Sequence, residues 1–315
     1  MPHILTVTMN PALDVSTSVD KVGPSHKLRC SATHTHPGGG GINVARVMHR
    51  LGSDCEALYL AGGVTGQKLG QLLDRERVRQ HVITIAGDTR ESFSVHETST
   101  GLDYRFVLPG PATQASEWES CLAHIHALDA APRYLVVSGG LPPGVPDDFH
   151  ARLARLAHER GSLVVLDASG PALAAALAEG VYLVKPSLRE LRELSGLPLA
   201  TEPDWTRAAQ RIIQAGHAQI VALSLGEDGA LLVSANTTLR ARSVHVDVLS
   251  TIGAGDSFVG GLVWALDRGD SIEQALRYGM AAGAGALLSP GTALCEAADV
   301  QRLHDQVRVT TAAAP

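Results

Sequence analysis

Short apolar segments alternate with amphipathic segments along most of this chain, and this alternation limits the fold more than any other feature. Apolar segments rich in β-branched residues cover residues 4–9, 57–60, 134–137, 163–166, 182–184 and 220–223, and predict buried strands. Apolar residues at helical spacing predict helices over 42–51, 68–75, 117–128, 149–158 and 206–215. Strands that are apolar on both faces need a covering layer on each side. The pattern therefore predicts an α/β fold with a central, mostly parallel sheet between two layers of helices.

Two segments interrupt this alternation. Residues 12–35 and 90–108 alternate polar and apolar side chains, which predicts half-exposed antiparallel strands. Both lie between segments of the parallel sheet, so we interpret them as a flap that grows out of one domain spanning residues 1–315. The last third of the chain is predicted to be helical over 254–268, 271–288 and 297–308, and residues 310–315 are predicted to be disordered.

Composition excludes several classes of partner. The chain has 315 residues, of which 45% are hydrophobic, which is enough for one large core. Its net charge of −6 argues against a nucleic acid or an anionic membrane as the main partner. The four cysteines have no paired spacing, which favours reduced thiols in a cytoplasmic protein. No signal peptide is visible, and no apolar window approaches the roughly 18 residues of a membrane span.

A glycine-rich turn at Gly253, Ala254 and Gly255 leads through Asp256 into an apolar helix. Small residues let the backbone turn sharply and direct several N–H groups to one point, and the helix N-terminus adds a partial positive charge there. Such a site favours a phosphate group. Asp256 would then take a proton from an attacking hydroxyl. The alternative is that Asp256 only caps the helix.

A second glycine cluster, at residues 38–41, precedes a predicted helix that carries Asn43 in its first turn. The glycines let a ligand lie against the backbone, and Asn43 offers both a donor and an acceptor. Residues 34–37 do not read as a core strand, so we reject a dinucleotide-binding loop. Asp14 follows the first predicted strand, at the edge where ligands bind in parallel sheets, although it would also suit a simple turn.

Other polar residues extend these two clusters. Arg90 and Arg105 lie at facing ends of the predicted flap strands, and Lys27 lies on the earlier flap segment. Exposed arginines are usually solvated, but several above a glycine-lined cleft would suit a phosphorylated substrate. Glu190 follows a strand at the start of a helix, where it would reach a metal–phosphate group.

Taken in order, these motifs resemble the ribokinase-like (PfkB) carbohydrate kinases over about residues 3–305. The matching segments are residues 10–14, 38–46, 138–144, 185–190, 224–229 and 253–256. Local similarity at residues 27–30, 104–107 and 291–295 is greatest to the minor bacterial 6-phosphofructokinase type. The resemblance implies a ribokinase-like three-layer sandwich with a small β-strand lid, and an ATP-dependent kinase of sugar phosphates.

The resemblance also implies a role for each matching residue. Asp256 would be the general base, with Gly253, Ala254 and Gly255 as the anion hole. The sugar hydroxyls would contact Asp14, Gly39, Gly40 and Asn43, and the sugar 6-phosphate would contact Arg90, Arg105 and Lys27, from this chain or from a second copy. The nucleotide would contact Lys185, Ser187, Ser224, Gly226 and Gly229. Glu190 would order Mg²⁺ through water, and Ser250, Ile252 and Gly291 resemble a monovalent-cation loop for K⁺. Pairing of two lids would make a homodimer.

Three residues depart from the family pattern: Ser187 stands in place of a common asparagine, Gly140 in place of serine, and Ala293 in place of arginine. Gly40 stands where 1-phosphofructokinases and tagatose-6-phosphate kinases usually carry lysine. We therefore expect phosphorylation of fructose 6-phosphate at its C1 hydroxyl. The alternatives are a tagatose-6-phosphate kinase, a 1-phosphofructokinase, and a sugar-phosphate-binding regulator without turnover.

Overall fold

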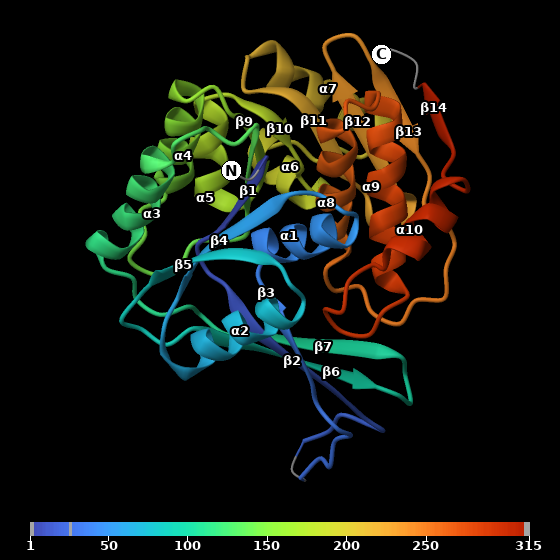
Figure 1. The fold of residues 1–315 in the computed structure, drawn as a ribbon. Coiled ribbons are helices and arrows are strands. Elements are labelled where there is room, and N and C mark those ends of the chain that lie inside the picture. The colour runs from blue at the N-terminus through green and yellow to red at the C-terminus, as the bar shows by residue number, and fades with distance from the viewer. Residues whose placement is uncertain (1–2, 25–26, 312–315) are drawn as a thin grey trace.

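The computed structural model describes residues 3–24 and 27–311, and a ten-stranded sheet runs through its centre (Figure 1). In spatial order the strands are β14 (Val309–Thr311), β13 (Thr238–Ala241), β12 (Ala230–Ser234), β11 (Ala218–Ser224), β10 (Val181–Val184), β9 (Leu163–Asp167), β8 (Tyr134–Ser138), β1 (Ile4–Thr8), β4 (Cys55–Ala61) and β5 (Arg79–Thr84). Neighbouring strands from β11 to β5 pair in parallel, and β11 to β14 pair antiparallel. The mostly parallel sheet confirms the predicted α/β class.

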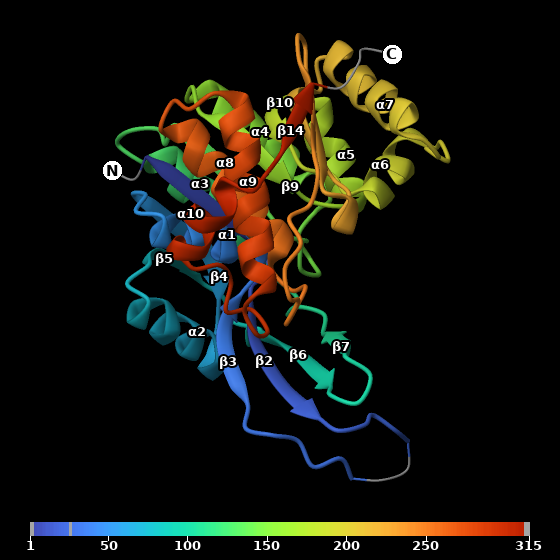
Figure 2. The same ribbon diagram turned by 90° about the vertical axis from the view of Figure 1, so that its right-hand side faces the viewer.

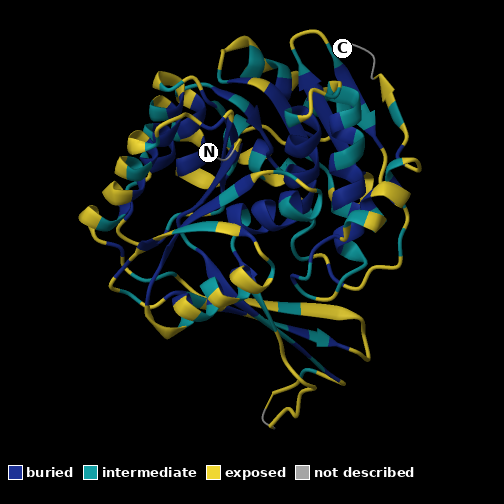
Figure 3. Ribbon diagram, viewed as in Figure 1, coloured by how far each residue is buried: buried dark blue, intermediate teal, exposed yellow. Residues whose placement is uncertain are grey.

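Helices cover both faces of this sheet, as the two-sided apolar strands require. Within β1, Ile4 belongs to one apolar core, whereas Leu5 and Val7 belong to the other. The first core is completed by α1 (Gly40–Arg50), α2 (Gly63–Arg75), α8 (Ala254–Asp267), α9 (Ile272–Leu287) and α10 (Ala297–His304). The second is completed by α3 (Ala115–Ala127), α4 (Phe149–Glu159), α5 (Gly170–Ala178), α6 (Leu188–Ser195) and α7 (Glu202–Gln214). Figure 3 shows the buried sheet between these layers.

The predicted flap is a separate four-stranded sheet that projects from the body of the molecule (Figure 2). Its order is β3 (His34–Gly38), β2 (Ala12–Val19), β6 (Arg90–Glu97) and β7 (Leu102–Val107). The outer pairs are antiparallel, as predicted, but the central pair β2–β6 is parallel, so the prediction was wrong there. Alternation of polar and apolar side chains indicates that one face of a strand is buried, but it does not indicate whether the strand runs parallel or antiparallel to its neighbour. We call this sheet the lid.

The C-terminal predictions hold in part. Helices α8 and α9 lie within a residue or two of the predicted bounds, whereas α10 ends at His304 rather than at residue 308. The disorder predicted from residue 310 was wrong for Thr310 and Thr311, which pair with β13 at the edge of the large sheet. Residues 312–315 lie outside the described part of the chain. Among the described residues, no helix is both long and apolar enough to cross a membrane.

Candidate active site

The carboxyl ends of the parallel strands and the inner side of the lid enclose a pocket of about 280 Å³. Most of the residues predicted to bind the sugar or catalyse transfer line it together: Asp14, Gly39, Gly40, Asn43, Arg90, Arg105 and Asp256. Glu190, which was predicted to order Mg²⁺, lines the same pocket. A second pocket of about 390 Å³ adjoins it and is lined by Lys185, Gly253 and Gly255. Asp256 and Arg105 line both pockets. The fold thus brings residues from the two ends of the chain to one place.

Gly253 begins helix α8 in the left-handed backbone conformation, with φ of 79°. A Cβ at this position would overlap the side chain of Leu294, so only glycine fits without strain. Gly253 is therefore the N-cap, and Asp256 is the third residue of the helix, so the alternative that Asp256 is only the cap is wrong. The N–H groups of this first turn have no partners within the helix. They are available to an anion beside Asp256.

The carboxylate of Asp256 accepts a hydrogen bond of 2.8 Å from Nδ2 of Asn43. Burial, followed by the negative charge of Asp167, raises the pKa of Asp256 to about 7. The hydrogen bond from Asn43 and the positive charges of Lys185 and Arg105 act in the opposite direction. A carboxyl with this pKa can accept a proton at neutral pH and is a stronger base than an ordinary aspartate.

Asp167 is a site residue that the sequence analysis missed. It is the last residue of β9, lines both pockets and forms an ion pair with Lys185, with 3.0 Å between Oδ1 and Nζ. Burial raises the pKa of Asp167, whereas the charge of Lys185 opposes this rise. Burial would lower the pKa of Lys185, but the charges of Asp167, Glu190 and Asp256 raise it. The position of Asp167 at the carboxyl end of an apolar strand, the signal used for Asp14, would have identified it.

Ser187 and Glu190 form a capping box at the start of α6. One carboxylate oxygen of Glu190 accepts hydrogen bonds from the Ser187 backbone N–H at 2.7 Å and from its hydroxyl at 2.8 Å. Glu190 lines the 280 Å³ pocket, but Ser187 lines neither pocket. The departure at position 187 therefore leaves a serine that holds Glu190 in place.

Three further residues of the predicted nucleotide set lie beside this helix. Ser224 pairs with Ser187 through an isolated backbone bridge, and Gly226 and Gly229 form the turn that follows β11. None of these three described residues lines either pocket. Their predicted contact with a nucleotide stays a prediction.

The basic residues of the lid differ in position. Arg105 is exposed and reaches both pockets, whereas Arg90 donates hydrogen bonds of 3.0 Å to the backbone carbonyls of Leu108 and Asn10. The pKa of buried Asp14 is raised by burial, against the charge of Arg105, a hydrogen bond from Thr292 and the charge of Arg90. Lys27 is exposed in the segment between β2 and β3 and lines neither pocket, so this chain alone does not bring it to the site.

The residues of the predicted cation loop also lie together. Ser250, Ile252 and Gly291 line a pocket of about 230 Å³ between the lid and the loops before α8 and after α9. The described residues contain no cluster of three or more histidine, cysteine, aspartate or glutamate side chains that would hold a metal. Mg²⁺ in nucleotide sites is commonly held by one or two carboxylates together with phosphates and water. Asp167 and Glu190 on one pocket fit that requirement.

Sequence comparison identifies the family. The model of the pfkB family carbohydrate kinases matches residues 8–299. A Mycobacterium tuberculosis protein named ATP-dependent 6-phosphofructokinase isozyme 2 is 46% identical over 96% of this chain and 89% of its own length. The Escherichia coli protein of the same name is 40% identical over 96% of this chain and 98% of its own length. A 1-phosphofructokinase of Xanthomonas campestris is 36% identical over 88% of each chain.

Solved structures agree with this assignment. Escherichia coli phosphofructokinase-2 in complex with potassium superposes with a TM-score of 0.92 at 40% identity, over 97% of this chain and 99% of that one. The same enzyme in complex with fructose-6-phosphate gives a TM-score of 0.91 at 39% identity, with the same coverage, and it has also been solved as a tetrameric inhibited form. Arabidopsis thaliana ribokinase, 18% identical over 96% of this chain and 98% of its own, has a TM-score of 0.77, which confirms the ribokinase-like fold. The chain belongs to the pfkB family of carbohydrate kinases and is an ATP-dependent sugar kinase.

Proposed function

We propose that the protein transfers the γ-phosphoryl group of ATP to the C1 hydroxyl of fructose 6-phosphate, which gives fructose 1,6-bisphosphate. The observation that carries this proposal is the placement of Asp256. Its carboxyl group, with a pKa near 7, lies in the first turn of α8 and shares one pocket with two arginines of the lid. The site thus combines a base, an anion-binding helix end and groups suited to a second phosphate.

Each part of the site has a task in this reaction. Asp14 and Asn43, with the backbone at Gly39 and Gly40, orient the sugar hydroxyls. Asp256 takes the proton of the C1 hydroxyl as its oxygen attacks the γ-phosphorus. The N–H groups of the turn that begins at Gly253 stabilise the charge on the transferring group, and ADP leaves on the opposite side.

Charged residues line the part of the site where the nucleotide phosphates would bind. Lys185, fixed by Asp167, lies beside the glycine turn and neutralises phosphate charge. Glu190 would hold Mg²⁺ through water, with Asp167 as a second carboxylate on the same pocket. When bound, Mg²⁺ supplies further neutralisation of the nucleotide phosphates. We assign K⁺ to the pocket lined by Ser250, Ile252 and Gly291.

The 6-phosphate would lie against the lid. Arg105 and Arg90 line the pocket and offer the planar fork that binds phosphate oxygens. Lys27 lies away from the site of its own chain, so we propose that it acts in the site of a second copy. The lid exposes Phe93, Phe106 and Val107, a set of apolar side chains suited to pairing of two lids in a homodimer. A cytoplasmic location is part of the same proposal.

Gly40 supports this substrate over fructose 1-phosphate and tagatose 6-phosphate. A Cβ at Gly40 would overlap the side chain of Ser138 and lie 2.9 Å from its backbone carbon. The loop of this chain is therefore closed to the lysine that is usual in kinases for those two sugars. We keep both as alternatives, because the sugars are distinguished by only a few hydrogen bonds.

The proposal is tested by steady-state kinetics of Asp256→Asn with ATP, Mg²⁺ and fructose 6-phosphate. The neutral amide cannot take the proton, so we expect kcat to fall by roughly 10²–10⁴-fold while KM changes little. Asp54→Asn is the matched control, since Asp54 is an exposed surface partner of Arg79 and should keep wild-type kinetics. Turnover near the wild-type value in Asp256→Asn would refute the assigned base. Sugar-phosphate binding without turnover in the wild-type protein would favour the regulator.

A further inference from the structure

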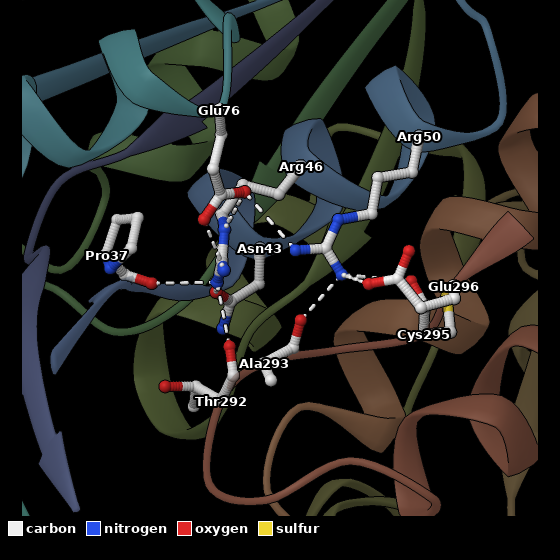
Figure 4. Close-up of polar contacts among 9 residues, drawn as sticks. All are labelled: Pro37, Asn43, Arg46, Arg50, Glu76, Thr292, Ala293, Cys295 and Glu296. Atoms are coloured by element: carbon white, nitrogen blue, oxygen red, sulfur yellow. Dashed lines mark hydrogen bonds and ion pairs between the residues drawn. The ribbon is translucent and has the colours of Figure 1, made fainter. Parts of the chain in front are cut away.

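Arg46 is the most deeply buried ionisable side chain beside the site, and it lines neither pocket. Its polar contacts are drawn in Figure 4. It lies on α1, and its side chain has 0% exposure. Its Nε and Nη2 donate to the two carboxylate oxygens of Glu76 at 2.9 and 2.7 Å. Glu76 follows α2 and is itself 25% exposed. The carboxylate of Glu76, which lines neither pocket, thus balances the charge of Arg46.

The other side of the same guanidinium faces the catalytic residues. Nη1 of Arg46 donates to the backbone carbonyls of Pro37 at 3.0 Å and Thr292 at 2.9 Å. It also lies 3.3 Å from Oδ1 of Asn43, while Nδ2 of Asn43 donates to Asp256 at 2.8 Å. Because Nη1 carries two hydrogens and faces three acceptors, one hydrogen is shared between Oδ1 of Asn43 and a backbone carbonyl. A continuous set of hydrogen bonds therefore runs from Glu76 through Arg46 and Asn43 to Asp256.

This arrangement decides which end of the Asn43 amide faces Asp256. A guanidinium has only donors, so it can accept nothing from the amide and must face its oxygen. The NH₂ end of Asn43 is then turned to the Asp256 carboxylate. With the opposite orientation, the amide oxygen would face the carboxylate, two acceptors would meet, and the ionised form of Asp256 would lose a donor.

We propose that Arg46 is a positioning residue of the kinase: it fixes the orientation of the Asn43 amide and thereby keeps Asp256 ionised and ready to accept the proton of the sugar hydroxyl. The inference rests on the proposed role of Asp256 as the base. The charged groups that act most strongly on Asp256 are Asp167, Lys185 and Arg105, and Asp14, Arg90 and Glu190 line the same pocket. Those that face Arg46 are Glu76, Arg50, Asp14 and His36. Arg46 therefore acts through Asn43 rather than by its own charge.

The test is the pH profile of kcat for Arg46→Met, measured with ATP, Mg²⁺ and fructose 6-phosphate. Methionine keeps much of the volume and removes every donor. We expect the midpoint of the acidic limb to move up by about 0.5–1 pH unit, because Asp256 loses a fixed donor. The same substitution in an Asn43→Ala background should move the midpoint no further, because alanine has no amide through which Arg46 could act on Asp256.

Arg50 provides the matched control. It also bonds Glu76, at 3.4 Å, and it holds the carbonyls of Ala293 at 2.6 Å and Cys295 at 3.1 Å, but it has no bond to Asn43. Arg50→Gln therefore removes a comparable part of the network, and we expect the midpoint to stay at the wild-type value. If Arg46→Met does not fold because it leaves the Glu76 carboxylate without its partner, the double variant Arg46→Met/Glu76→Gln removes that charge as well, and the same criteria apply.

Two results would overturn the inference: an unchanged midpoint in a folded Arg46 variant, or equal midpoint shifts in the presence and absence of Asn43. Both leave the proposed function intact if Asp256→Asn is inactive. An active Asp256→Asn enzyme would instead remove the base itself, so the two failures are distinguishable.

Discussion

The pKa of Asp256 predicts how kcat of the kinase depends on pH. A base with a pKa of about 7 is ionised in ~9% of molecules at pH 6 and in ~91% at pH 8, so kcat should rise about tenfold across this interval. The rise should level off above pH 8. An ordinary aspartate, with a pKa near 3.9, would give a flat profile over the same range. The assay is ADP release at saturating substrates between pH 5.5 and 9.

A substitution at Asp167 separates this titration from that of the nucleotide, whose phosphates also titrate near neutral pH. The negative charge of Asp167 raises the pKa of Asp256, and removal of Asp167 also frees the positive charge of Lys185. Both effects of Asp167→Asn act in one direction, so the midpoint should move down by roughly one unit. A profile that is flat between pH 6 and 8, or a midpoint that Asp167→Asn leaves in place, would show that Asp256 is not the titrating base.

Three further predictions follow from the same contacts. Arg105→Ala should raise KM for the phosphorylated sugar more than KM for ATP, and equal effects in a two-substrate analysis would make Arg105 structural. Gly253→Ala should cost about 1–3 kcal/mol of stability in a denaturant titration and lower kcat at least tenfold, because it combines a φ of 79° with an overlap on Leu294. Asp256→Asn should match the wild-type free energy of unfolding near pH 4 and exceed it by about 2 kcal/mol at pH 8. Folding raises the pKa of Asp256, so this group costs the wild type stability as the pH rises from about 4 through about 7, and the variant lacks this contribution. The full shift would correspond to about 4 kcal/mol, which we halve because the Asp256 side chain is half-buried and keeps contact with solvent. An unchanged difference across this pH range would contradict the assignment.

The sequence predicted the layers of this fold well, because continuous apolar strands report burial on both faces. Ile4 and Leu5 are neighbours in β1 and belong to opposite cores, which is the arrangement that such a pattern requires. The direction of the central lid pair was wrong, since alternation is the same in parallel and antiparallel strands. Edge strands such as β14 were missed because three residues carry almost no periodicity.

The residues of the candidate site were predictable where a polar side chain lies at the end of a strand or in a glycine-rich turn. Asp14, Asn43 and Asp256 meet at one pocket, as their motifs indicated. The Asp167–Lys185 pair joins the last residue of β9 to the residue that follows the neighbouring strand β10, and the two partners cannot be matched without the strand order. The buried network of Arg46 joins α1, the end of α2 and the loop after α9, a set of segments that only tertiary packing brings together.

The choice of sugar substrate distinguishes the proposed 6-phosphofructokinase from its alternatives. The measurement is ADP release by the purified protein with ATP and Mg²⁺ on fructose 6-phosphate, tagatose 6-phosphate, fructose 1-phosphate and unphosphorylated fructose. We expect kcat/KM to be highest for fructose 6-phosphate and lowest for unphosphorylated fructose, because fructose has no phosphate for the arginines of the lid to bind. A higher kcat/KM for another sugar phosphate would overturn the substrate and keep the mechanism. The absence of turnover on all four sugars would contradict the proposed function.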